Sequence, residues 1–172
     1  MFKLIIFDCD GVLVDSEKIA NEVFAKVLNK ECGFNLNLDD MFNTFVGHSS
    51  KQCMQIIAKM LGKEPPKHIE QLYKSEINAA LANKVTAVRG VENVLKMLKE
   101  ELKIPFCVAS SGSHEKMNTT LGKTGLIKYF KSENIFSASD VKNGKPKPDI
   151  YLHAAREMGN FEAQDCLSLI HI

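Results

Sequence analysis

Short apolar runs separated by stretches of helical periodicity define the pattern of this chain. The apolar runs are Lys3 to Phe7, Pro105 to Ala109, Asn134 to Ser137 and a run that begins at Cys166. Short runs that are apolar throughout are typical of strands buried on both faces of a parallel sheet. We therefore predict a parallel strand at each of these positions.

Helical spacing fills the intervals between the later runs. The apolar positions that share a helical face are Val91, Val94, Leu95 and Leu98 in one interval, and Met117, Leu121 and Thr124 in the next. Residues 150–158 predict a further helix, with Pro148 and Asp149 near its first turn. Strands that alternate with helices imply an α/β fold with a parallel sheet and right-handed crossovers.

The interval between the first two strands is too long for a single crossover helix. From about residue 16 to residue 88 the pattern is helical throughout. Its breaks fall at Gly33, Gly47, Gly62 and Pro65-Pro66. A separate helical subdomain inserted after the first strand explains this pattern. The expected domains are a discontinuous core of residues 1–15 and 88–172, and a helical cap of residues 16–87.

Composition narrows the class of protein. Of the 172 residues, 45% are hydrophobic and 25% are charged, which is typical of globular proteins. The net charge of +1 argues against a nucleic-acid partner, which needs a concentrated basic face. Asp8 and Asp10 interrupt the first apolar run before it could form a signal peptide, and no run is long enough to span a membrane. The five cysteines lack metal-type spacing, so we expect reduced thiols in a cytoplasmic protein.

Two carboxylates, Asp8 and Asp10, follow the first predicted strand, and Gly11 comes after them. In an open α/β sheet, ligands bind beyond the carboxyl ends of the strands. If strand geometry continues through Asp10, both carboxylates face one side, and Gly11 then permits a tight turn. Clustered carboxylates need a compensating cation or proton, and hard oxygen ligands suit Mg²⁺. The alternative is a pair of solvated aspartates in a turn. That alternative suits an arbitrary Asp-x-Asp sequence, but it is disfavoured here because a predicted strand precedes the pair and a glycine follows it.

Two further segments carry candidate chemistry. Ser110, Ser111 and Gly112 follow the second predicted strand, where hydroxyl and backbone N–H groups can bind an anion. Taken alone, such a cluster also fits an ordinary loop and helix N-cap. Residues 144–149 contain Lys-Pro-Lys-Pro, which by itself is typical of a solvated loop before a helix.

Together, residues 7–17, 108–113 and 144–149 resemble the first three signature motifs of the haloacid dehalogenase superfamily, in the same order. The resemblance implies a Rossmann-like core with an inserted α-helical cap, and a Mg²⁺-dependent phosphatase. It also implies that Asp8 is the nucleophile, which forms an aspartyl phosphate. Asp10 is then the residue that protonates the leaving group and activates water.

The same resemblance implies the ligands. Asp8 and Asp10 are the expected Mg²⁺ ligands, and Ser110 and Ser111 are expected to bind phosphate. Lys145 is expected to neutralise the nucleophile and the transferring phosphoryl group. The expected partner is a small phosphorylated metabolite, without nucleic acid or membrane, and the expected state is a monomer.

The resemblance ends near residue 167. After a strand that begins near Cys166, members of the family carry an acidic motif that helps to hold Mg²⁺. Here residues 168–172 follow instead, and no carboxylate comes after Asp165. His171 is a poor substitute, because imidazole is a weak partner for Mg²⁺. We expect a core truncated at its C-terminus, with a strand edge exposed, and an inactive phosphate-binding fragment is an alternative to an active enzyme.

Within the family, the chain is most similar to 6-phosphogluconate phosphatase-like members, so a sugar or sugar-acid phosphate is the expected substrate. β-Phosphoglucomutase-like members carry a histidine in the first cap helix, where residues 19–21 here are Ile-Ala-Asn. A phosphatase is therefore favoured over a phosphosugar mutase. Residues 46–50 stand where such caps present a substrate-selecting loop, which makes Gly47 and His48 candidate substrate-binding residues. A turn followed by a serine N-cap is the alternative.

Overall fold

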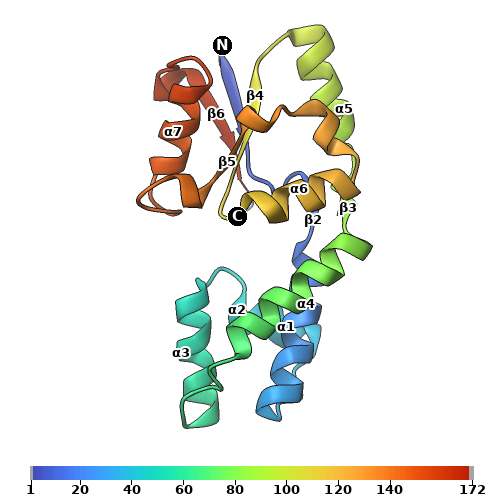
Figure 1. Ribbon diagram of the computed structural model, residues 1–172, viewed down its shortest axis with the longest axis vertical. Helices are drawn as coiled ribbons and strands as arrows, with labels where there is room; N and C mark the ends of the chain where they lie inside the picture. The colour runs from blue at the N-terminus through green and yellow to red at the C-terminus, as the bar shows by residue number, and fades with distance from the viewer. Residues whose placement is uncertain (1, 171–172) are drawn as a thin grey trace. The chain divides into compact units, whose positions relative to one another are not determined.

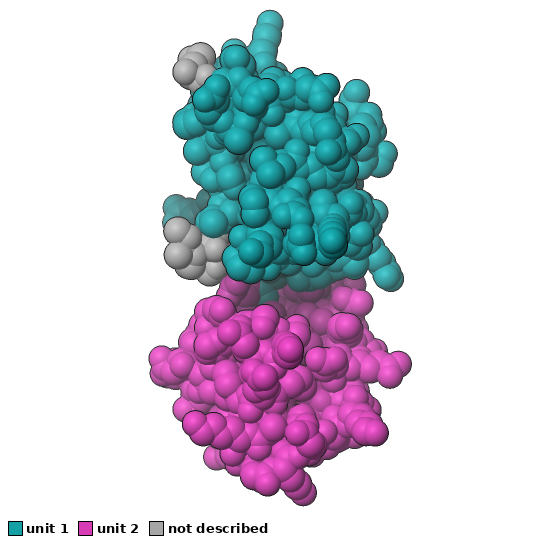
Figure 2. Space-filling model, turned by 90° about the vertical axis from the view of Figure 1, so that its left-hand side faces the viewer, with its two compact units in different colours: residues 1–16, 85–171 teal, residues 17–84, 172 magenta. Residues whose placement is uncertain are grey.

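The computed structural model describes residues 2–170, which divide into two compact units (Figure 1). Unit 1 contains residues 2–16 and 85–170, and unit 2 contains residues 17–84 (Figure 2). Each unit has a hydrophobic core of its own. Within the described range, no helix has the length and apolar character needed to cross a membrane.

Unit 1 is built on a parallel sheet in which the strand order is β5-β4-β1-β6. The strands are β1 (Leu4–Phe7), β4 (Phe106–Ser110), β5 (Ile135–Ser137) and β6 (Cys166–Leu169). Every residue of β1 and β4 is buried, as expected for central strands with both faces covered. The parallel α/β sheet predicted from the apolar runs is therefore confirmed.

The direction of the chain across this sheet decides where its helices lie. From β1 the chain moves to β4 and then to β5 on one side, and it returns past β1 to reach β6. Right-handed crossovers then place α5 and α6 on one face and α7 on the other, as Figure 1 shows. The helical segments are α5 (Val91–Lys96) with a π-helical continuation (Met97–Leu102), α6 (His114–Lys123) and α7 (Asp149–Glu157). Short 3₁₀ turns cover Leu126–Tyr129, Ser132–Asn134, Ala138–Asp140 and Ala163–Asp165.

The buried face of α5 is narrower than predicted. Val91, Leu95 and Leu98 are buried, but Val94, which the pattern put on the same helical face, is 39% exposed. The three buried positions follow the spacing i, i+4, i+7, and Val94 lies at the border of that stripe.

A short antiparallel pair of strands was not predicted. β2 (Val14–Asp15) pairs with β3 (Thr86–Ala87), where the chain leaves unit 1 and where it returns. Two residues are too few for an apolar pattern to develop, so periodicity gives no sign of such strands.

Unit 2 is a bundle of four helices: α1 (Glu17–Cys32), α2 (Leu38–Phe45), α3 (Ser50–Leu61) and α4 (Ile69–Lys84). Its core is formed by Phe24, Leu28, Met41, Phe45, Ile57, Ile69 and their neighbours. Reciprocal capping boxes open α2 at Asn37 and α3 at Ser49. Gly62, with φ of 68°, ends α3 in the left-handed conformation that glycine adopts without strain.

Candidate active site

Asp8 lies at the topological switch point of the sheet. Counted along the chain within this sheet alone, the strand order is 3-2-1-4, so the order reverses between β1 and β6. The crevice beyond the carboxyl ends of such strands is where ligands bind in open α/β sheets. Phe7 is the last residue of β1 and stands opposite Leu169 of β6. The N–H of Asp8 then donates to the carbonyl oxygen of Leu169 at 2.8 Å, which ties Asp8 to the end of β6 at the switch point.

The segment after β1 turns tightly instead of continuing as a strand. Gly11 has a φ of 72°, and the carbonyl oxygen of Cys9 accepts the N–H groups of both Leu13 and Val14. Asp8 and Asp10 are nevertheless both partly exposed, while Cys9 between them is buried. The predicted alternation of the carboxylates therefore holds in burial, although β1 itself ends at Phe7.

Asp8 forms an ion pair with Lys145. Its Oδ2 lies 2.8 Å from Lys145 Nζ, and both side chains are mostly buried, with exposed fractions of 16% and 19%. Its Oδ1 accepts the N–H of Cys9 at 2.8 Å. The geometry of the Lys145 contact is that of an ion pair alone, because Nζ is buried and has no hydrogen-bond partner among residues 2–170. A buried ammonium group with unused N–H bonds is ready to bind a further anion.

Asp10 is held by two residues that the sequence did not assign to the site. Ser16 Oγ donates to its Oδ1 at 2.6 Å, and Lys116 Nζ donates to its Oδ2 at 2.8 Å. Ser16 belongs to the first motif, so its distance from Asp10 in the sequence was a usable signal. Lys116 lies in the first turn of α6, where long side chains point back toward the helix N-terminus and the preceding loop.

The loop between β4 and α6 lies against Asp10. Ser110 is buried, and its Oγ accepts the N–H of Gly112 at 3.1 Å, while Ser111 is exposed. A Cβ at Gly112 would stand 3.5 Å from Ser110 Oγ and 3.9 Å from Asp10 Oδ2. Ser110 and Asp10 are thus neighbours on either side of Gly112, each at ordinary van der Waals distance from that position.

A second set of hydrogen bonds supports this loop from behind. Ser137 Oγ donates to the carbonyl oxygen of Gly112 at 2.8 Å. Asp140 Oδ2 accepts the N–H of Ser137 at 2.7 Å, and His114 Nε2 lies 2.9 Å from both oxygens of Asp140. Burial by itself raises the pKa of Asp140, but the Ser137 N–H and His114 outweigh it and lower that pKa below its ordinary value. The loop is therefore anchored to the segment that follows β5.

Cys9 is the one thiol placed between the two aspartates, and its environment makes it inert. Burial, with the nearby charge of Asp10, raises the pKa of Cys9 to about 12. At neutral pH the thiolate fraction is then on the order of 10⁻⁵, and the thiol is not a useful nucleophile. All five cysteines are free in the structure. The carboxylate of Asp8 remains as the candidate nucleophile.

Gly47 and His48 belong to unit 2, where both are exposed between α2 and α3. The alternative interpretation of this segment is borne out locally, because the Oγ of Ser49 accepts the N–H of Gln52 and caps α3. A role of Gly47 and His48 in substrate binding stays a prediction.

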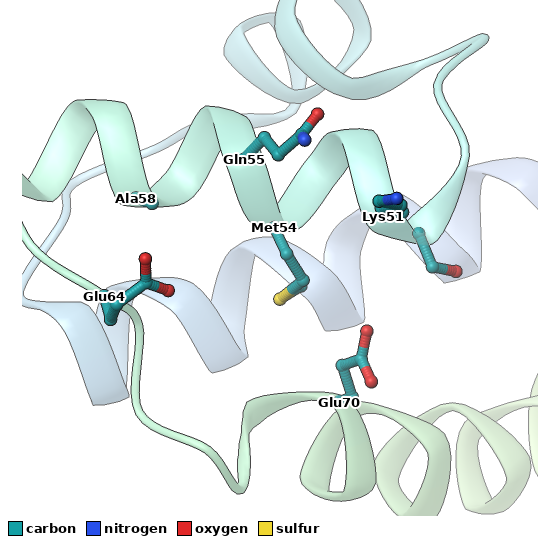
Figure 3. Close-up of a pocket in the computed structure, with 7 residues that line it drawn as sticks. Lys51, Met54, Gln55, Ala58, Glu64 and Glu70 are labelled. Carbon is teal, nitrogen blue, oxygen red and sulfur yellow. The ribbon is translucent and has the colours of Figure 1, made fainter.

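Unit 2 also contains an open hollow of about 480 Å³. In Figure 3, Met54 of α3 points toward the side on which Glu70 of α4 lies, with Lys51 and Glu64 at the two ends. None of the predicted site residues lines this hollow, and its two glutamates would repel a phosphate. We place the candidate site at the end of β1 instead, because paired charges converge there.

The side chains at the end of β1 are of the chemical type that binds a divalent cation. Mg²⁺ in proteins is often held by one or two carboxylates, with water and substrate phosphate completing its shell. Asp8 and Asp10 supply such carboxylates, and an oxygen that already accepts one hydrogen bond keeps a further lone pair. Residues 2–170 contain no cluster of three or more histidine, cysteine, aspartate or glutamate side chains suited to a metal. His171, the other conceivable ligand, lies outside the described residues.

The strand order and the paired charges at the switch point define a Rossmann-like α/β protein. The model of the haloacid dehalogenase-like hydrolase family matches residues 5–167, and the chain therefore belongs to this family. It is 30% identical to 6-phosphogluconate phosphatase of Escherichia coli (strain K12), over 95% of this chain and 71% of that protein.

Solved structures agree with this assignment. A haloacid dehalogenase-like protein of unknown function from Agrobacterium tumefaciens str. C58 superposes with a TM-score of 0.85 at 32% identity, over 98% of this chain and 73% of that chain. A HAD family hydrolase from Deinococcus radiodurans R1, solved with bound phosphate and sodium, has a TM-score of 0.77 at 31% identity, over 97% and 71%.

Proposed function

We propose that this protein is a Mg²⁺-dependent phosphatase that hydrolyses a small sugar or sugar-acid phosphate through an aspartyl phosphate on Asp8. Membership of the family, together with a named phosphatase among its relatives, identifies a phosphoric monoester hydrolase. The observation that carries the finer proposal is the ion pair of Asp8 with Lys145. It combines a carboxylate at the switch point with a buried ammonium group that has hydrogen bonds to spare.

In the first step, a carboxylate oxygen of Asp8 attacks phosphorus, and the bond between phosphorus and the ester oxygen breaks. The electron pair of that bond stays on the ester oxygen, which takes a proton from Asp10 and leaves as an alcohol. Lys145 is placed to stabilise the negative charge of the phosphoryl oxygens during transfer. Ser110, buried at the end of β4, offers its hydroxyl to the same group.

In the second step, water attacks the phosphorus of the aspartyl phosphate and gives its proton to Asp10. The bond between phosphorus and Asp8 breaks, which restores the carboxylate and releases inorganic phosphate. Asp8 and Asp10 would hold the Mg²⁺, which when bound supplies positive charge that offsets the phosphate oxygens. The phosphate bound to the related hydrolase of Deinococcus radiodurans R1 supports a phosphate site in this fold.

The substrate class rests on the relatives and on residues 16–87, which we propose to be a cap that selects the substrate. The name of the Escherichia coli relative favours a phosphorylated sugar acid. Gly47 and His48 are the proposed contacts of the cap. Transfer between sugar hydroxyls is disfavoured, because Asn21, near the position of the mutase histidine, is buried and donates its Nδ2 hydrogen to the carbonyl oxygen of Glu17.

Phosphate release from p-nitrophenyl phosphate and from 6-phosphogluconate, with Mg²⁺ or with EDTA, tests the proposal. Release that requires Mg²⁺ should be lost in Asp8→Asn and retained in Asp15→Asn, an exposed carboxylate of the same segment. Lys145→Met should lower turnover at least about 100-fold, since it removes a charge that stabilises the transition state. Lys147→Met, exposed in the same loop, is its matched control.

Two outcomes would contradict the proposal. Equal release by the Asp8→Asn variant would show that another residue attacks phosphorus. No release from any substrate, combined with thermal stabilisation by inorganic phosphate, would favour the alternative of an inactive phosphate-binding protein.

A further inference from the structure

The two lysines near the aspartates make contacts of different kinds. Lys145 Nζ forms an ion pair with Asp8 and has no hydrogen-bond partner among the described residues. Lys116 Nζ, by contrast, donates a hydrogen bond of 2.8 Å to Asp10 Oδ2. Each ammonium group has three N–H bonds, so Lys116 keeps two after its bond to Asp10, but the Nζ of Lys145 is buried and has no hydrogen-bond partner among the described residues. This difference indicates that the two lysines have separate tasks.

Lys116 reaches Asp10 from a fixed starting point. Ser113 caps α6 and its Oγ accepts the N–H of Lys116 at 3.2 Å, which holds the backbone of Lys116 in the first helical turn. The side chain then passes over Gly112, where an added Cβ would stand 3.4 Å from Lys116 Cδ. α6 is itself connected to the segment of the aspartates, because Thr120 Oγ1 contacts Cys9 Sγ at 3.9 Å. The ammonium group is thus delivered to Asp10 along a path defined by close contacts.

Asp10 needs such support, because it lies outside the sheet in the turn that Gly11 makes. Both of its carboxylate oxygens are held, Oδ1 by the hydroxyl of Ser16 and Oδ2 by Lys116. With one donor on each oxygen, the plane of the carboxylate has a single favoured orientation. A group that transfers protons works well only when it is held in reach of the reacting oxygen.

We propose that Lys116 is a positioning residue for the reaction, which holds the carboxyl group of Asp10 in the orientation from which its acid form protonates the leaving group. The inference rests on the proposed function, in which Asp10 is the acid. Lys116 forms no bond to the substrate in this role, and its proton stays on the lysine throughout. Its contribution is the orientation of Asp10.

Substrates that differ in their leaving group can distinguish the positioning of Asp10 from a direct contact between Lys116 and the substrate. p-Nitrophenolate leaves as a stable anion and needs little protonation, whereas the alkoxide of glycerol phosphate needs a proton. The ratio kcat/KM reports the steps up to aspartyl phosphate formation, before water attacks. In Lys116→Met, kcat/KM should fall about 100-fold for glycerol phosphate but less than about 3-fold for p-nitrophenyl phosphate. Glycerol phosphate carries no second anionic group, so a lost contact between Lys116 and a substrate carboxylate cannot cause this pattern.

Three variants complete the experiment. Asp10→Asn should show the same dependence on the leaving group, and adding Lys116→Met to it should cause no further loss. Lys116→Arg should restore part of the activity toward glycerol phosphate, because it returns a donor to Asp10. Lys123→Met, at the exposed end of the same helix, should behave as wild type.

The possible results are distinguishable. If Asp10→Asn affects both substrates equally, Asp10 is not the acid, and both the proposed function and the inference fail. If Asp10→Asn discriminates between the substrates but Lys116→Met does not, the inference alone fails. A measurement without turnover checks the same point: in crystals of Lys116→Met, Asp10 should occupy more than one rotamer, and a single unchanged rotamer would overturn the proposal.

Discussion

Removing the ammonium group of Lys145 should destabilise the folded chain as well as impair turnover. Lys145→Met keeps most of the side-chain volume but leaves the carboxylate of Asp8 without its cation, at 16% exposure. Asp8→Asn is the reciprocal change, because it leaves the buried ammonium group without an anion. Each single variant therefore contains one uncompensated charge, whereas the double variant contains none.

The distance between the two charges gives the expected size of the effect. At 2.8 Å, the Coulomb attraction is about 6 kcal/mol for an effective dielectric constant of about 20. Loss of hydration offsets most of this attraction, since removing each ion from water costs several kcal/mol. We expect a net coupling free energy of about 1–3 kcal/mol between Asp8 and Lys145. That value lies above the range of about 0.2–1 kcal/mol for exposed ion pairs.

A double-mutant cycle measures this coupling. The wild type, both single variants and the double variant are unfolded in urea at neutral pH with EDTA, and followed by circular dichroism because the chain has no tryptophan. The double variant should lose less unfolding free energy than the two single variants lose when their losses are added together. A coupling below about 0.3 kcal/mol would refute the reasoning, since it is within the error of additivity for independent sites.

Three further outcomes follow from other parts of the structure. Burial raises the pKa of both Cys9 and Cys107 to about 12, so these thiols should react with a thiol reagent only after the chain unfolds. Mass spectrometry of samples labelled during a pulse of urea can measure this, and rapid labelling of the native chain would contradict the prediction. Because the pKa of Asp140 is lowered in the folded state, its carboxylate adds stability above its unfolded pKa and loses it as pH falls through the folded pKa. Asp140→Asn should therefore lower the free energy of unfolding by about 1 kcal/mol near pH 7, and by almost nothing at a pH below the folded pKa of Asp140. Equal losses at both pH values, measured by urea unfolding, would show that the charge of Asp140 does not stabilise the fold. Gly112→Ala should keep kcat within a few-fold of wild type, because the added methyl would meet Lys116 Cδ and Ser110 Oγ only at the ordinary contact distances of 3.4–3.5 Å. Gly122→Ala, with open space around it, should gain about 0.5–1 kcal/mol of stability and keep its activity, and a loss of stability in urea unfolding would contradict this expectation.

The part of the fold that the sequence predicted is the part with long apolar patterns. The runs that became β1, β4, β5 and β6 were recognisable because central parallel strands must be apolar on both faces. The two-residue strands β2 and β3 have no such pattern and were missed. The exposure of Val94 was not predictable, because helical periodicity alone does not say how wide the buried stripe is.

The residues of the candidate site also divide into those that the sequence predicted and those that it did not. Asp8, Ser110 and Lys145 were singled out because their residue types stand at the ends of strands or in matching motifs. Ser16 was overlooked although it lies inside the first motif, and Lys116 could not be singled out, because its contact depends on where α6 begins. Hydrogen bonds of that kind join positions 6 and 106 residues from Asp10, and no periodicity records them.

The charges at the end of β1 lead to a last prediction. Asp8 and Asp10 each lie 2.8 Å from the ammonium group of one lysine, Lys145 and Lys116, so both lysine charges already face a protein carboxyl group. A phosphate monoester brings a charge of about −2 at neutral pH, and a divalent cation restores the balance. Phosphate and Mg²⁺ should therefore tighten each other's binding by the same factor, which calorimetric titration of each in the presence of the other can measure. Independent binding of the two would show that they do not share this site, and Lys145→Met should make phosphate binding depend more steeply on Mg²⁺.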